Sequence, residues 1–99
     1  MTPMTYPAFE AAALARGFDQ VLERKWAPDT VVGTHAHPFD ADALIVQGEM
    51  WLTVNGVAKH LRSGDTFNLD ANVSHSERYG SDGATFWVAR RNVAPAAAA

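Results

Sequence analysis

The segment GTHAHPFDADALIVQG (residues 33–48) places two histidines at alternate positions of a stretch with strand character. Side chains two residues apart on a β-strand project from the same face. His35 and His37 can therefore direct both imidazoles at one metal ion, at bond lengths of about 2 Å. The alternative is an ordinary pair of polar side chains on a solvated strand face.

A second segment, GDTFNLDANVSHSERY (residues 64–79), carries the candidate third ligand, His75. Glu77 and Tyr79 share its face by alternation, and we take both as candidate catalytic residues. Glu77 could also give the metal a carboxylate. The alternative for Glu77 is an ion pair with Arg90 or Arg91.

The composition limits what such a site can be. The 99 residues include no cysteine, so disulfides, thiolate metal sites and cysteine nucleophiles are excluded. A net charge of −3 and a pI near 5.7 do not favour a nucleic-acid partner. No stretch has the pattern of a signal peptide or the length of a membrane span, so we expect a soluble, cytoplasmic protein.

The elements that must position these residues are short strands. One helix is predicted over 7–16, where Pro7 suits the first turn and Gly17 the end. About eight strands follow, a number typical of a β-sandwich or barrel. They are expected over 18–26, 30–37, 43–47, 49–54, 57–62, 66–69, 73–79 and 84–91.

Three parts of the chain follow from this pattern. Residues 1–17 form an N-terminal segment with the short helix, and residues 18–92 form the β-barrel. Residues 93–99, an alanine- and proline-rich tail, are expected to be disordered.

The order and spacing of the two motifs resemble the cupin family. Cupins carry G-x5-H-x-H-x(3,4)-E-x6-G and then G-x5-P-x-G-x2-H-x3-N. The segment HAHPFDADALIVQG is similar to the first motif, and the interval from Gly64 to His75 matches the second. The resemblance covers about residues 18–91. It implies an all-β jelly-roll barrel that pairs into a homodimer and holds a divalent Fe, Mn, Ni, Cu or Zn ion at His35, His37 and His75.

Departures from the cupin pattern fall on the carboxylate ligand and the second turn. Counted back from Gly48, the cupin glutamate corresponds to Ala41. Asp42 fits the count from His37, but a one-residue shift reverses the face of a strand, so a bulge would have to re-aim it. Asp42 and Glu77 are therefore the two candidates for a fourth ligand. Some cupin dioxygenases hold iron with three histidines alone.

The remaining candidates would line the pocket. Phe39 could gate its mouth or simply close the barrel end, while Gln47 and Tyr79 could contact a substrate. His60, on the return strand of the Asn-Gly hairpin, is expected at the surface and not as a ligand.

Three function classes fit these residues. The first is a metal-dependent, dioxygenase-type enzyme that acts on a small organic molecule. The second is a cupin module that binds or senses a small molecule or metal without turnover. The third, weaker one is a metal-free isomerase or epimerase in which a barrel histidine acts as a base.

Overall fold

The N-terminal helix has the boundaries that its capping residues dictate. The computed structural model describes residues 4–92, so the predicted tail 93–99 lies outside the described residues. Helix α1 (Tyr6–Ala15) is preceded by its N-cap residue Thr5, whose side chain accepts a hydrogen bond from the Ala8 amide. Pro7 lies in the first turn, and Gly17 follows the end with a positive φ of 94°.

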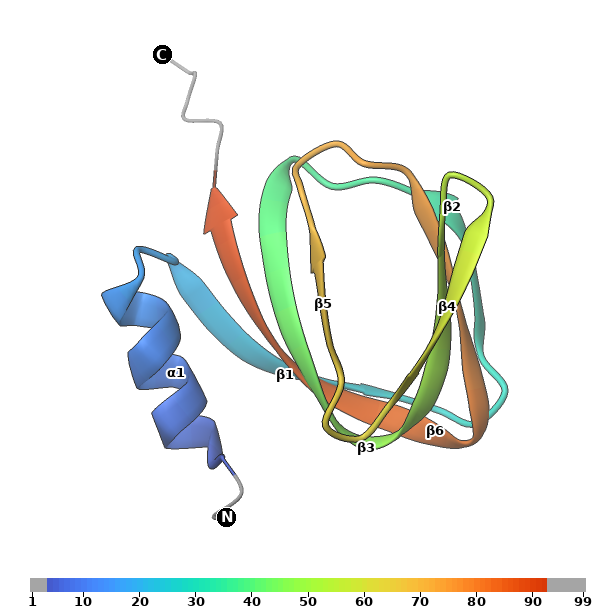
Figure 1. Cartoon of the computed structure of the whole chain (residues 1–99), viewed down its shortest axis with the longest axis horizontal. Helices are drawn as coiled ribbons and strands as arrows, with labels where there is room; N and C mark the ends of the chain where they lie inside the picture. Colours follow the sequence, from blue (N-terminus) through green and yellow to red (C-terminus); the bar gives the residue numbers. More distant parts are fainter. Residues whose placement is uncertain (1–3, 93–99) are drawn as a thin grey trace.

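The rest of the described chain is built from six strands. They are β1 (Gln20–Trp26), β2 (Val31–His35), β3 (Phe39–Val54), β4 (Val57–Arg62), β5 (Thr66–Leu69) and β6 (His75–Asn92). All pair antiparallel in the order β1-β6-β3-β4, with β2 also on β6 and β5 also on β3. Figure 1 shows β3 and β6 curving around a barrel, so the predicted all-β jelly roll is confirmed.

The strand count is lower than predicted because two expected corners are bends inside long strands. Strand β3 continues through Gly48, and β6 continues through residues 80–83. The pairing of β3 with β6 shifts register between Ile45 and Gln47 and again after Gly48. β-Bulges of this kind bend a strand without ending it.

Two glycines allow the bent strands to touch. Gly48 has a φ of +79°, and a Cβ built there would lie 2.0 Å from the Gly83 carbonyl oxygen. Gly83 has a φ of +66°, and its Cβ would lie 2.2 Å from the Trp26 carbonyl oxygen. Only glycine accommodates both the backbone conformation and the contact.

The apolar side chains form two clusters on opposite sides of the sheet. The larger one lies inside the barrel and includes Ile45, Met50 and Tyr79. The smaller one lies outside, where Phe9 and Ala13 of α1 pack against Ala89 of β6. Helix α1 therefore covers the outer face of β1 and β6 (Figure 1) and does not enter the barrel. Among the described residues, no helix has the length and apolarity needed to cross a membrane.

Candidate metal centre

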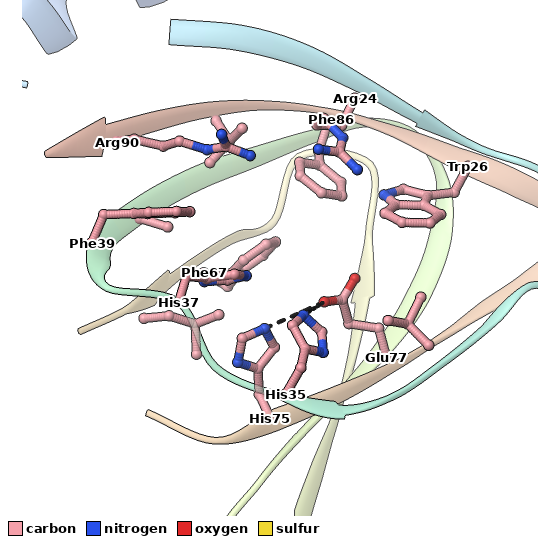
Figure 2. A pocket seen from close by; sticks show the side chains of 14 residues that line it. Arg24, Trp26, His35, His37, Phe39, Phe67, His75, Glu77, Phe86 and Arg90 are labelled. Atoms are coloured by element: carbon pink, nitrogen blue, oxygen red, sulfur yellow. Dashed lines mark ion pairs between the residues drawn. The ribbon is translucent and has the colours of Figure 1, made fainter. Parts of the chain in front are cut away.

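Three histidines meet inside the barrel. One ring nitrogen from each of His35, His37 and His75 lies within 4.8 Å of the other two. His35 ends β2 and pairs in register with His75 at the start of β6. His37 follows just beyond β2, and its carbonyl accepts a 2.7 Å hydrogen bond from the Asn72 amide. The sequence-predicted trio is thus brought together by a strand pair and a turn (Figure 2).

The turn that holds His37 explains one departure from the cupin motif. Asn72 stands where the motif has glycine, and its φ is +67°. Asparagine tolerates this left-handed conformation better than other non-glycine residues do. The substitution therefore keeps the turn that tethers His37.

The backbone fixes which nitrogens face the cavity. His75 Nδ1 lies 3.0 Å from the Val73 carbonyl, and His35 Nδ1 lies 2.8 Å from the Gly33 carbonyl. A carbonyl oxygen only accepts, so both Nδ1 atoms carry the proton and both Nε2 atoms present a lone pair. Metal-binding histidines are usually oriented by such a bond from the other ring nitrogen.

His37 is positioned by aromatic stacking. Its ring lies on Phe39 with centroids 4.6 Å apart and planes 8° apart. Burial, together with His75, His35 and Arg90, lowers the pKa of His37. A lowered pKa favours the neutral imidazole, which is the form that binds metals.

Glu77 lies against the histidines. Its Oε2 atom is 3.4 Å from His75 Nε2 and 3.5 Å from His35 Nε2, and its side chain is 11% exposed. Its Oε1 atom accepts a hydrogen bond from the Tyr79 hydroxyl. The alternative ion pair of Glu77 with Arg90 or Arg91 does not form: Arg91 pairs with Asp40 instead, and Arg90 lines the cavity without an ion-pair partner among the described residues.

Tyr79 supports Glu77 rather than facing the pocket. It is fully buried, stacks on Trp26 at 5.1 Å, and does not line the cavity that the histidines share. Burial and the hydrogen bond to Glu77 raise the pKa of Tyr79. The phenol therefore stays protonated and acts as a donor that orients the carboxylate.

The other carboxylate candidate points away from the histidines. Asp42 lies on the outside of β3, where its Oδ2 atom is 3.2 Å from Arg16 of the N-terminal segment. Ala41, at the position of the cupin glutamate, is buried and lines the cavity. No bulge falls between them and the register with β5 is regular, so Asp42 keeps the outward face.

Gln47 does not lie in the pocket. The register shift between Ile45 and Gln47 reverses the alternation, and Gln47 is exposed, where it bonds Thr85 and the Asp82 carbonyl. Its expected inward position was wrong because the bulge has no sequence signature. His60 is exposed as expected and lies 2.6 Å from Glu49.

The histidines line one end of a cavity of about 230 Å³. Phe39 lines it as predicted. Further residues that were not anticipated as site residues line it too, among them Arg24, Trp26, Phe67, Phe86 and Arg90. Strands β1 and β6 are remote in sequence, and Arg24 of β1 pairs with Phe86 of β6. No local sequence pattern reveals that pairing.

The donor set fits a divalent transition metal. His75 Nε2 is buried and has no hydrogen-bond partner within the described residues. Ligands bound at 2.0–2.2 Å in a tetrahedral arrangement lie about 3.4 Å apart, which matches the separations between Glu77 Oε2 and the two Nε2 atoms. Three imidazoles and one carboxylate suit Fe, Mn, Ni, Cu or Zn.

Comparison with known sequences gives one partial match. No protein-family model matches the chain. One curated relative, an uncharacterized HTH-type transcriptional regulator from Haemophilus influenzae, is 49% identical over 39 residues. That match covers 39% of this chain and only 13% of the regulator.

Solved structures align with most of the chain. An RmlC-like cupin from Shewanella frigidimarina aligns over 78% of this chain and 68% of its own, with 23% identity and a TM-score of 0.63. A predicted oxalate decarboxylase from Thermotoga maritima aligns over 83% and 73%, with 19% identity and a TM-score of 0.64. A chain from the structures of two DMSP lyases aligns over 74% and 38%, with 24% identity and a TM-score of 0.68. The chain therefore has the fold of a small cupin domain.

Proposed function

We propose that the protein is a metal-dependent enzyme that holds one divalent transition metal at His35, His37 and His75. The observation that carries the proposal is the convergence of three ring nitrogens at one end of a cavity, with the buried Nε2 of His75 left without a partner. When bound, such an ion supplies Lewis-acid or redox chemistry to a small substrate.

We further propose that Glu77 supplies the carboxylate that Ala41 lacks. It approaches the histidines from β6, whereas the cupin glutamate position lies on β3. Tyr79 holds Oε1 of Glu77, which leaves Oε2 toward His35 and His75. In this arrangement Glu77 completes the ligand set or takes a proton from the substrate.

Oxygenation of a small organic substrate is the reaction to test first, on the basis of the cupin resemblance. The test supplies the metal-loaded protein with diketone, thiol and phenolic compounds and measures oxygen consumption. Turnover that requires the metal and is lost in His75→Ala is the expected result. The control is His60→Ala, which removes an exposed histidine outside the cluster. Turnover that survives His75→Ala would contradict the proposal.

A sensing module is the second candidate, because the match to part of an HTH-type regulator favours it. In that case the metal and a small molecule bind tightly, and no compound is consumed. Calorimetric binding without turnover distinguishes this candidate from an enzyme.

The assembly and location of the protein are also proposals. The cupin resemblance favours a homodimer, which sedimentation equilibrium would test. The composition favours the cytoplasm, which fractionation of the source cells would test.

A further inference from the structure

Two arginines line the wall of the cavity that faces the histidines. Arg24 comes from β1 and Arg90 from β6, and Figure 2 shows them across the pocket from His35 and His75. Each guanidinium lies over an aromatic ring. Arg24 Cζ is 5.1 Å from the Trp26 ring, and Arg90 Cζ is 4.7 Å from the Phe39 ring. Stacking of this kind orients a guanidinium without neutralising its charge.

The charge of this wall is not balanced by the protein. Within residues 4–92, neither Arg24 nor Arg90 forms an ion pair. Glu77, the acidic residue that lines the cavity, lies against the histidines and accepts a hydrogen bond from Tyr79, and it pairs with neither arginine. Burial and the neighbouring Arg24 lower the pKa of Arg90, as expected for like charges on one wall.

Two buried donors of residues that line this cavity also lack partners. Trp26 Nε1 and Arg90 Nε have no acceptor within the described residues, and both side chains line this cavity. Buried N–H groups are nearly always satisfied in folded proteins. Unsatisfied donors beside two unpaired guanidiniums indicate a ligand that brings several acceptor oxygens.

We propose that Arg24, Arg90 and Trp26 form an anion subsite that binds the carboxylate of a small organic acid. A guanidinium fork matches a carboxylate with two parallel hydrogen bonds. The T-shaped pair Phe67–Phe86, with centroids 5.6 Å apart, gives the acid an apolar wall for its body. The part of this inference that places the far end of the acid at the histidines rests on the proposed metal site.

The Trp26 indole N–H gives a direct readout inside the pocket. Its NMR signal is assigned with Trp26→Phe, and benzoate, phenyl phosphate and neutral benzamide are titrated into metal-free and zinc-loaded protein. We expect benzoate to shift the Trp26 signal and benzamide to leave it unchanged at the same concentration. Arg24→Gln and Arg90→Gln should each weaken benzoate binding about tenfold or more, and Arg90→Lys should weaken it less.

The controls remove equal charge outside the pocket. Lys25→Gln and Arg91→Gln change the next residue on each strand, and both side chains are exposed. They should bind benzoate as the wild type does. Unchanged benzoate affinity in the Arg24 and Arg90 variants, or equal shifts with benzamide, would overturn the subsite. Tighter binding of phenyl phosphate than of benzoate would overturn the carboxylate assignment. Failure of Fe, Mn, Ni, Cu and Zn all to bind, with benzoate still held, would instead overturn only the proposed function.

Discussion

At the scale of single residues, the candidate site depends on the groups that orient each of its side chains. Backbone carbonyls orient His35 and His75, a stacked ring orients His37, and a phenol orients Glu77. The three candidate histidines could be predicted from sequence because His35 and His37 are two residues apart and His75 lies at the motif's distance from Gly64, although His37 is placed by a turn and not by the strand. Their supports could not, since each depends on local backbone geometry or packing.

Tyr79→Phe tests the support of Glu77. The variant keeps the ring that packs on Trp26 but removes the donor to Oε1. We expect metal affinity to fall by about tenfold, as is typical when the partner behind a ligand is lost. Competition with a chelating dye measures this change. Unaltered affinity would mean that Tyr79 plays no part in positioning the carboxylate.

The lowered pKa of His37 predicts that the free energy of unfolding of the metal-free protein depends on pH. Its folded pKa is lowered, mainly by burial, relative to the unfolded value of about 6.5. Below that pH the unfolded chain binds a proton that the folded chain resists, so the free energy of unfolding decreases as the pH falls below about 6.5. Urea titrations across this range measure the slope. His37→Gln should flatten it, and an unchanged slope would contradict the origin assigned here.

At the scale of elements, the two long bent strands decide which side chains face the cavity. The helix, β4 and β5 follow the sequence pattern closely because their boundaries lie at capping residues and turns. The bends at Gly48 and Gly83 look like ordinary turns in sequence, since the contact between them is remote in the chain. The outward position of Gln47 follows from the register shift between Ile45 and Gln47 in β3.

Gly48→Ala tests the crossing of β3 and β6. The added methyl would lie 2.0 Å from the Gly83 oxygen at a φ of +79°. We expect the free energy of unfolding to fall by more than about 3 kcal/mol, because strain and overpacking combine. Gly56→Ala is the matched control, with a φ of +78° and no atom within 4 Å. It should cost only about 1–2 kcal/mol. Equal losses in urea denaturation would show that the contact is unimportant.

At the scale of the whole molecule, helix α1 and the candidate metal site lie on different sides of the sheet. Helix α1 packs outside on β1 and β6, while the three histidines lie inside the barrel. The fold and the three histidines could be predicted from the two spaced motifs. The two arginines of the opposite wall could not, because only the β1–β6 pairing brings Arg24 to the pocket.

Phe9→Ala tests this separation. Phe9 is 9% exposed and packs on Trp87 and Ala89, away from the cavity. Its truncation should lower the free energy of unfolding by about 3 kcal/mol and leave the metal content per folded molecule unchanged. Loss of metal from the folded variant would show that the helix and the site are coupled.

The central claim is that His35, His37 and His75 form a metal site, and elemental analysis tests it most directly. The proteins compared are the wild type, His75→Ala and His60→Ala, each untagged and purified without chelator. The account predicts one equivalent of a transition metal in the wild type and in His60→Ala, and none in His75→Ala. A wild-type protein that holds no metal after incubation with Fe, Mn, Ni, Cu or Zn would contradict it, as would equal metal in all three proteins.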